Sequence, residues 1–394
     1  MFALDTCVNL GTMASIALVM SLYYADVRSG GMIRYPAITF LVMFLVWWFF
    51  IRVPPSNSLK GRRLLITGAA HGLGKAIAIL AASRGATLVL WDIDGAALEE
   101  VAAEARGALR ETGHDVGPRD RRAVQTRVVD VGSESEIEDG AKEAMRGQNG
   151  LDSVVSCAGV LNGVSAGALT GAALSRVLAV NVGGPFSLYR HFLPHMLAGA
   201  KGADTQKGTF VFLGSVMGAL GAAQLADYAA SKAALHGMCD SLRQELNREG
   251  LRGKVGVHLV CPWILGDTEM FQGAYSKRQG ACCSRTVLRI IPPLKSPILA
   301  GHVLDGLAFS HGSHWVTYLP LITRYATLLP KFFLSPSLSA YDALLGAVGG
   351  SHGMEGWRGS LWNTNLGLAG VKSKAAGTAA AATSTMTTST SGAK

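Results

Sequence analysis

The sequence contains no C-x-x-C pair and no even spacing of cysteines. Its six cysteines are irregularly placed, which argues against a disulfide-stapled scaffold and offers no zinc-ligand pattern. We therefore expect reduced thiols and no metal site. A dense basic run with interleaved aromatic residues is also missing, although the formal net charge is +9. The charge favours contact with an anionic lipid surface over nucleic acid.

The N-terminus lacks the basic region that opens a cleaved signal peptide. Two uncharged apolar stretches occur there instead, one between Asp5 and Asp26 and one between Arg34 and Arg52. As a helix, residues 36–51 would rise about 24 Å, which is short of a hydrocarbon core of about 30 Å. This second helix would therefore span a thinned bilayer or lie partly in the interface.

Residues 1–55 are accordingly predicted to be a membrane anchor of one or two helices. Lys and Arg are more frequent just after the second apolar stretch than just before it, so the positive-inside bias places the downstream domain in the cytosol. The endoplasmic reticulum and the lipid droplet surface are both compatible membranes. At the other end, residues 346–394 form a tail that is predicted to be disordered after position 374, because its Ala/Ser/Thr composition buries little apolar surface.

Between these segments, residues 56–345 are predicted to form one α/β domain. Short β-branched runs alternate with Ala-rich helical segments, which is typical of βαβ units. We expect a Rossmann-type, doubly wound parallel sheet with helices on both faces. The predicted strands are Arg63–Thr67, Thr87–Asp92, Thr126–Asp130, Ser153–Cys157, Thr209–Gly214 and Val255–Val260.

A glycine-rich turn follows the first predicted strand and opens a helix. Glycine allows a tight turn, and it lets backbone N–H groups approach a pyrophosphate at the positive end of that helix. The strand before and the helix after make this a predicted dinucleotide site. Its candidate cofactor-binding residues are Gly68, His71, Gly72, Leu73 and Gly74.

Two aspartates at strand ends are further candidates for the cofactor site. Asp92 ends the second strand, eighteen residues after Gly74, where a carboxylate can accept hydrogen bonds from ribose hydroxyls and would repel a 2′-phosphate. NAD is therefore favoured, with NADP as the alternative because a protonated His71 would favour a phosphate. Asp130 is a candidate for the adenine edge. A capping role in the following turn remains open for both aspartates.

The most informative segment holds Tyr228 and Lys232. On a helix this spacing puts the phenol and the ammonium on one face. Tyrosine titrates near pH 10, but a Lys ammonium and an oxidised nicotinamide both favour the phenolate, so the phenol can exchange a proton with an alcohol. Ser215 ends a strand thirteen residues before Tyr228, where its hydroxyl can hydrogen-bond the substrate oxygen.

From about Leu64 to Thr268 the sequence resembles the short-chain dehydrogenase/reductase family, through the glycine turn, Asn181 and the Ser215, Tyr228 and Lys232 set. The resemblance implies that Tyr228 is the general acid/base and that Ser215 orients the substrate oxygen. Lys232 would bind the nicotinamide ribose and lower the pKa of the tyrosine. It implies further that Asn181 holds a proton-relay water. Ala158, Gly159 and Thr268 would complete the cofactor site.

The apolar N-terminus and the segment from Leu88 to Ile93 are most similar to the membrane-bound retinol dehydrogenase and 17β-hydroxysteroid dehydrogenase group. This implies oxidation of a retinoid, a steroid or a long-chain alcohol with NAD. A substrate lid is expected at about residues 263–300, and the resemblance is compatible with a homodimer. Residues 317–334 are apolar with scattered basic residues, so they fit a membrane-surface segment or a buried helix equally well.

Three sites depart from the family pattern. Ser156 and Cys157 stand where the family usually has two asparagines, which makes the first departure a pair of residues; Trp263 replaces a glycine after Pro262, and Gly214 replaces a serine. None of these changes removes a proton-transfer group, so altered affinity or specificity is expected rather than loss of chemistry. Two other functions stay open: an NADPH-dependent ketone reductase of the 3-ketosphinganine type, and a non-catalytic nucleotide-binding scaffold.

Overall fold

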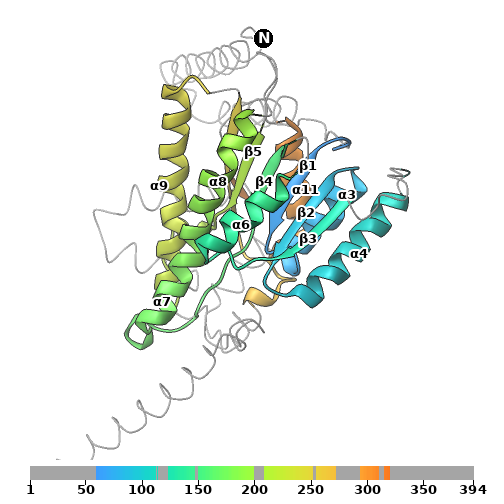
Figure 1. Cartoon of the computed structure of the whole chain (residues 1–394). Helices are drawn as coiled ribbons and strands as arrows, with labels where there is room; N and C mark the ends of the chain where they lie inside the picture. The colour runs from blue at the N-terminus through green and yellow to red at the C-terminus, as the bar shows by residue number, and fades with distance from the viewer. Residues whose placement is uncertain are drawn as a thin grey trace, which may run out of the picture. The chain divides into compact units, whose positions relative to one another are not determined.

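A computed structural model describes residues 59–111, 113, 123–146, 150–198, 208–251, 254–271, 293–309 and 315–319. They form a seven-stranded, wholly parallel sheet in the order β3-β2-β1-β4-β5-β6-β7 (Figure 1). The predicted anchor in residues 1–55 and the predicted tail in residues 346–394 lie outside the described residues.

The sequence predicted six of these strands, and all six are present. The third lies two residues earlier than expected, at 124–128, because its last residues already belong to the following turn. The strands are β1 (Arg63–Thr67), β2 (Thr87–Asp92), β3 (Val124–Val128), β4 (Ser153–Ser156), β5 (Gly208–Leu213), β6 (Val255–Pro262) and β7 (Trp315–Leu319).

Strand β7 was not predicted. It pairs in parallel with β6, where Cys261 lies opposite Tyr318. The prediction that residues 317–334 form one membrane-surface segment or one buried helix is therefore wrong for their first three residues, which belong to the sheet. The rest of that segment lies outside the described residues. The run Trp-Val-Thr-Tyr-Leu is rich in aromatic and β-branched side chains and carried the signal for a strand.

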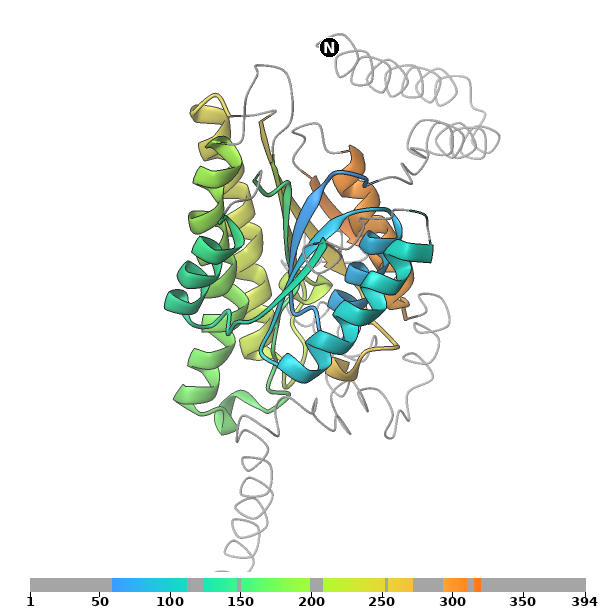
Figure 2. The ribbon, with the colours of Figure 1, turned by 45° about the vertical axis from the view of Figure 1, so that its right-hand side comes forward.

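Helices cover both faces of the sheet, as predicted, and Figure 2 shows the two helical layers with the sheet between them. One face is covered by α3 (Gly72–Ser83), α4 (Gly95–Glu111) and α11 (Ser296–Phe309). The other face is covered by α6 (Glu134–Ala144), α8 (Gly184–Ala198) and α9 (Ala226–Arg248). A shorter helix, α7 (Gly171–Leu178), precedes α8 and contacts α9.

The two cores follow from the alternation of side chains along each strand. In β1, Leu65 points into the core under α6, α8 and α9, whereas Leu64 and Ile66 point into the core under α3, α4 and α11. Every residue of β1 is buried. A strand that is apolar on both sides is expected at the centre of a parallel sheet covered by two helical layers.

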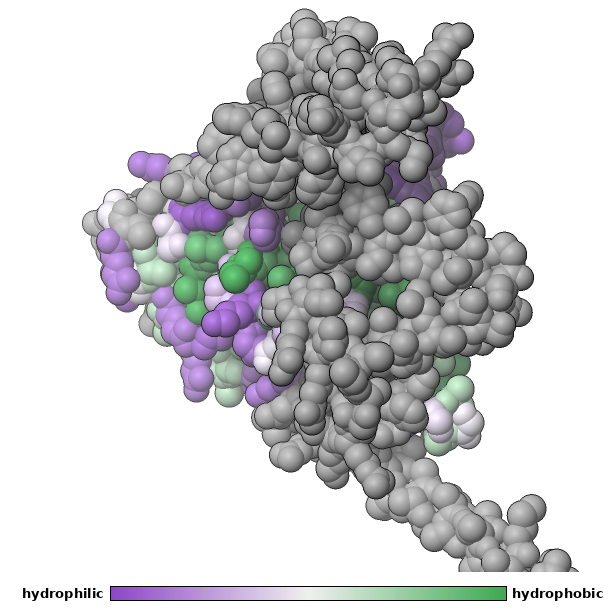
Figure 3. Space-filling model, turned by 180° about the vertical axis from the view of Figure 1, so that it is seen from behind, coloured by the Kyte–Doolittle hydropathy of each residue, from purple (hydrophilic) through white to green (hydrophobic). Residues whose placement is uncertain are grey.

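The exposed surface carries scattered apolar side chains among hydrophilic ones, as the view from behind shows (Figure 3). Large apolar side chains that are more than a third exposed are Val128, Leu174, Leu178, Phe186 and Ile298. Within the described ranges, no helix combines the length and the apolar character that crossing a membrane requires.

Candidate active site

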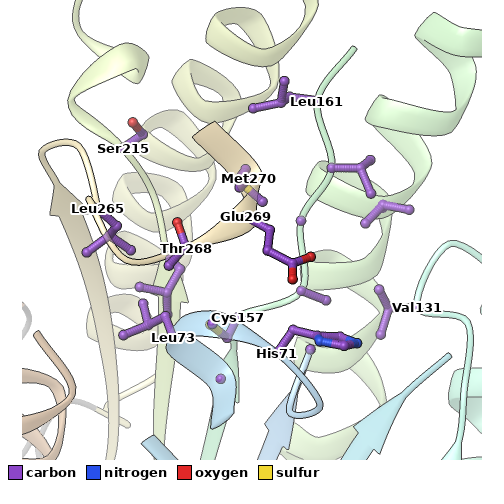
Figure 4. A pocket seen from close by; sticks show the side chains of 18 of the residues that line it. His71, Leu73, Val131, Cys157, Leu161, Ser215, Leu265, Thr268, Glu269 and Met270 are labelled. Atoms are coloured by element: carbon purple, nitrogen blue, oxygen red, sulfur yellow. The ribbon is translucent and has the colours of Figure 1, made fainter. Parts of the chain in front are cut away.

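A cavity of about 340 Å³ opens at the carboxyl ends of the strands, where the strand order reverses between β1 and β4. Ligands of doubly wound folds bind at this point of the sheet. Glu269 and Met270, from the one-turn helix η6 (Glu269–Phe271), project toward the cavity (Figure 4). Predicted site residues that line it are Gly68, His71, Gly72, Leu73, Gly74, Asp92, Asp130, Ala158, Gly159, Ser215, Tyr228, Lys232 and Thr268.

Two glycines of the turn are packed so closely that neither position has room for a side chain. A Cβ at Gly74 would lie 1.9 Å from the carbonyl oxygen of Gly68, and a Cβ at Gly68 would lie 2.8 Å from the backbone of Ala158. Gly68 also has a φ of +66°, which favours glycine. The turn therefore brings bare backbone to the start of α3, which fits a pyrophosphate group.

Asp92 is buried at the end of β2 and faces the glycine turn. Its carboxylate accepts the backbone N–H of Ala70 at 2.9 Å and that of Asp94 at 3.1 Å. The structure therefore shows Asp92 capping the turn that follows β2, which is one of its two predicted roles. Because the same carboxylate also lines the cavity, the ribose interpretation stays a proposal.

His71 lies at the start of α3 and pairs with a second carboxylate. Its Nε2 is 3.0 Å from Oδ2 of Asp94. Asp94 also accepts the N–H of Ala97, and this bond, followed by the contact with His71, lowers the pKa of the Asp94 carboxyl. A positive charge on His71 would thus be partly neutralised by Asp94, which weakens its value for a 2′-phosphate.

Asp130 lies in an ion pair that the sequence did not reveal. Its Oδ2 accepts from Nη1 of Arg176 at 2.7 Å, and its Oδ1 accepts the N–H of Gly132 at 2.8 Å. The turn-capping alternative is therefore observed, and the adenine role stays a proposal. Arg176 also lines the cavity. It sits on α7, 46 residues from Asp130, and an arginine on a helix surface carries no local signal of such a contact.

Helix α9 presents Tyr228 and Lys232 to the cavity together, as predicted. Both residues are buried, and Nζ of Lys232 lies 5.6 Å from the centroid of the Tyr228 ring. The ammonium donates to the carbonyl oxygen of Leu213, at the end of β5, at 2.6 Å. This bond ties the face of α9 that lines the cavity to the end of the strand that precedes Ser215.

Burial moves the pKa values of these two groups in opposite directions. It raises the pKa of Tyr228 to about 12, against a hydrogen bond with Ser215 that lowers it. It lowers the pKa of Lys232 to about 8. Burial is the largest effect on the pKa of Tyr228 in the protein without cofactor, so the lowering expected from Lys232 and an oxidised nicotinamide stays a prediction. A phenolate therefore needs further positive charge beside the ring.

Ser215 follows β5 and lines the cavity together with Leu213 and Gly214. Its backbone is extended, and its Oγ accepts the N–H of Met217 at 3.1 Å. The hydroxyl also hydrogen-bonds Tyr228. Ser215 and Tyr228 are thus close enough to bind one substrate oxygen between them.

Asn181 lies behind the cavity rather than in its lining. It sits in a π-helical segment, η4 (Ala179–Gly183), of the rare kind that often marks functional sites. Its side chain accepts the N–H of Val160 and donates to the carbonyl of Val160 and to Oγ of Ser231, each at 2.9 Å. Both amide hydrogens are used in these bonds, so the side chain keeps only the second lone pair of Oδ1 for a relay water, and that role stays a proposal.

The structure explains two departures from the family pattern. A Cβ at Gly214 would lie 3.0 Å from Sγ of Cys261 and 3.0 Å from Leu259, so Cys261 fills the space that a serine would need. Cys157 lines the cavity, and burial raises the pKa of its thiol to about 12, which keeps it protonated. Its backbone N–H donates to Oγ1 of Thr67.

Trp263 is the third departure, and the structure places it in the cavity wall. Its indole packs against the core under α8 and α9. The indole N–H is buried and has no hydrogen-bond acceptor among the described residues. The wall therefore gains a large apolar surface at the position where the family has a glycine.

The loop after β6 is fixed to the start of α11. Leu265 forms a bridge with Leu294, and both carboxylate oxygens of Asp267 accept from Ser296. Thr268 lies over the glycine turn, since a Cβ at Gly72 would be 3.2 Å from its methyl group. The predicted lid at residues 263–300 is thus described only at its two ends, because residues 272–292 lie outside the described part.

Comparisons with known proteins agree with this geometry. The family model for short chain dehydrogenases matches residues 62–279. Retinol dehydrogenase 10 of Xenopus tropicalis is 31% identical over 276 residues, which cover 65% of this chain and 76% of that protein.

Two solved structures are also similar. A short chain dehydrogenase/reductase from Burkholderia phymatum in complex with NAD is 24% identical, with a TM-score of 0.55, over 72% of this chain and 96% of that one. A short chain dehydrogenase from Escherichia coli CFT073 complexed with NADPH is 26% identical, with a TM-score of 0.54, over 67% and 98%.

The close packing of the glycine turn predicts that Gly74→Ala will weaken dinucleotide binding by at least about 10-fold, because the added methyl must displace the Gly68 carbonyl. Titration of tryptophan fluorescence with NADH measures this. The matched control is Gly107→Ala, in the middle of α4, where a Cβ meets nothing within 4 Å. Equal affinities for the two variants would contradict this assignment of the turn.

The lowered pKa of Lys232 predicts a pH-dependent difference in stability between wild type and Lys232→Met. Between pH 8 and 10.5 the unfolded wild-type chain holds a proton on this lysine that the folded chain has lost, so wild type gains stability as pH rises. The methionine variant has no such titration. Its stability relative to wild type should therefore fall by about 3 kcal/mol across this window.

Urea denaturation of both proteins at pH 8 and pH 10.5 measures that difference. If the difference in unfolding free energy between the two proteins stays constant with pH, the lysine is not desolvated.

Proposed function

The chain belongs to the short-chain dehydrogenase/reductase family, and on that basis we propose that it oxidises the hydroxyl group of a lipophilic alcohol with NAD. It is an NAD(P)-dependent oxidoreductase of that family. The observation that carries the proposal is the position of Tyr228. Its phenol is buried beside Lys232, hydrogen-bonded to Ser215, and in the same cavity as the glycine turn.

Proton transfer is the task of Tyr228. When an alcohol oxygen lies between Tyr228 and Ser215, the serine hydroxyl holds that oxygen in place and the phenolate accepts its proton. Burial raises the pKa of the phenol, so the ammonium of Lys232 and the positive ring of the bound oxidised cofactor must both favour the phenolate. When bound, the oxidised nicotinamide would supply the acceptor for the hydride that leaves the alcohol carbon.

Dinucleotide binding is proposed for the residues around the glycine turn. The backbone from Gly68 to Gly74 would hold the pyrophosphate, and Asp92 the adenosine ribose. The buried carboxylate of Asp92 would repel a 2′-phosphate, and His71 is already paired with Asp94. These two contacts support NAD over NADP.

The part of the cavity wall that lies away from the glycine turn supports the proposal of an apolar substrate. Leu161 lies on this wall, away from the glycine turn (Figure 4), and Val160, Trp263 and Met270 also contribute to the lining. A similar protein bears the name retinol dehydrogenase 10. We propose a retinoid, a steroid or a long-chain alcohol as the substrate, with a retinoid first.

Membrane attachment completes the proposal. Residues 1–55 would anchor residues 56–345 at the endoplasmic reticulum or at lipid droplets, with the catalytic domain in the cytosol. An apolar substrate dissolved in the bilayer would then be concentrated at the membrane that holds the enzyme. A homodimer remains compatible with this arrangement.

Replacing the proposed acid/base gives the most direct test. Tyr228→Phe should lower kcat/KM by about 10³-fold or more, because it removes the only atom that exchanges the proton, while NADH affinity stays within about twofold. Tyr189→Phe is the matched control. Tyr189 is also buried with a pKa raised to about 12, but it packs in the core on α8. Retained activity in Tyr228→Phe would overturn the mechanism.

Substrate and cofactor can be tested together with a panel of retinol, steroid alcohols and long-chain alcohols, each with NAD and with NADP. We expect retinol with NAD to give the largest kcat/KM, read from the absorbance of the reduced nicotinamide. Asp92→Ala should narrow the preference for NAD over NADP by about 10-fold or more, because the repulsion of the 2′-phosphate is lost. A strict NADPH requirement, with activity only toward ketones, would support the reductase alternative instead.

A further inference from the structure

The residues that lead into α9, one helical turn before Tyr228, have an unusual backbone conformation. Gln224 has a φ of +65°, the only positive φ of a non-glycine residue in the described part of the chain. Such a backbone costs energy and persists only where the surroundings enforce it. Leu225 occupies the N-cap position, and its apolar side chain makes no capping hydrogen bond. Other contacts must therefore fix this turn.

Asp227 supplies those contacts. It is only 3% exposed, directly precedes Tyr228, and uses Oδ1 to accept the backbone N–H of Tyr228 at 2.8 Å. Its Oδ2 accepts from Nδ2 of Asn162 at 2.6 Å. A buried carboxylate is tolerated when it is hydrogen-bonded in this way and lies at the positive end of a helix.

Asn162 links Asp227 to two further parts of the chain, the loop after β4 and helix α7. It is 7% exposed, belongs to the loop after β4, and donates to the carbonyl of Ala173 in α7 at 3.3 Å as well as to Asp227. The same loop lines the cavity from Cys157 to Leu161. The pair therefore joins the loop that borders both cofactor and substrate to the turn that carries Tyr228.

A second set of hydrogen bonds joins the same loop to α9, one turn further along the helix. Asn181 holds both main-chain polar groups of Val160 and donates to Ser231, whose Oγ donates in turn to the carbonyl of Tyr228. The backbone N–H of Tyr228 is thus held through Asp227 and its carbonyl through Ser231. Both links lead to the loop after β4.

We propose that Asp227 and Asn162 form a positioning pair, which sets the place of the Tyr228 phenol relative to the substrate wall formed by the loop after β4. The pair touches neither substrate nor cofactor and acts through Tyr228. The inference rests on the proposed role of Tyr228 as acid/base. A displacement of the reacting group by about 1 Å lowers rates by up to about 100-fold, so breaking the pair should affect the chemical step.

The test compares Asp227→Asn and Asn162→Ala with wild type, using retinol and NAD, or the panel alcohol that wild type oxidises fastest. Each variant should lower kcat about 10- to 100-fold, with KM for NAD and NADH affinity within about twofold. The isotope effect on kcat from an alcohol deuterated at the reacting carbon should rise, because the chemical step becomes slower than product release. The double variant should lose little more than either single variant.

The matched control is Asp152→Asn, at the amino ends of the central strands β1 and β4, opposite the cavity. Asp152 accepts the backbone N–H of Arg63 at 2.7 Å, so it has the same bond type as Asp227 without contact to the cavity. It should lower the melting temperature and leave kcat per folded protein unchanged. If Asp227→Asn does not fold, Asn162→Ala serves alone, since it leaves the acceptor for the Tyr228 N–H in place.

The outcomes separate the inference from the proposed function. If Tyr228→Phe is inactive and the pair variants behave like Asp152→Asn, the positioning pair is refuted and the proposed function stands. If Tyr228→Phe keeps its activity, both are refuted. A selective loss of kcat with a larger isotope effect supports the pair.

Discussion

The contact between the end of β1 and the end of β4 is the constraint on which the rest of the site depends. Oγ1 of Thr67 accepts the N–H groups of Cys157 and Ala158, and Gly68 leaves no room for a Cβ beside Ala158. Two backbones therefore meet without side chains between them where the strand order reverses. The floor of the cavity is bare backbone, so a phosphate can reach the start of α3.

Around this floor the protein buries groups that would ordinarily be exposed. Tyr228, Lys232, Asp92 and Asn181 are each less than 9% exposed, and their hydrogen-bonding groups are used within the chain or face the cavity. Such a network is costly to bury unless its members are paired, and it is rigid once they are. Rigidity suits the proposed proton transfer, because the phenol and the substrate oxygen would have to meet at a fixed distance.

The departures from the family pattern change the walls of the cavity and leave this network intact. Cys261 occupies the space beside Gly214, and Trp263 adds an indole to the lining. Trp263 makes the cavity wall bulkier than a glycine would. The changes therefore bear on which substrate fits, while Ser215 and Tyr228, the proposed proton-transfer groups, keep their positions.

Local pattern was sufficient for the fold class, six of the seven strands, the glycine turn and the pairing of Tyr228 with Lys232, because each depends on residues close together in the chain. Tertiary structure alone decided the rest. The salt bridge of Asp130, the side-chain bonds of Asn181 and the raised pKa of Tyr228 all depend on burial and on partners far away in sequence. Desolvation is a property of the packed cavity, and no spacing of residues along a chain encodes it.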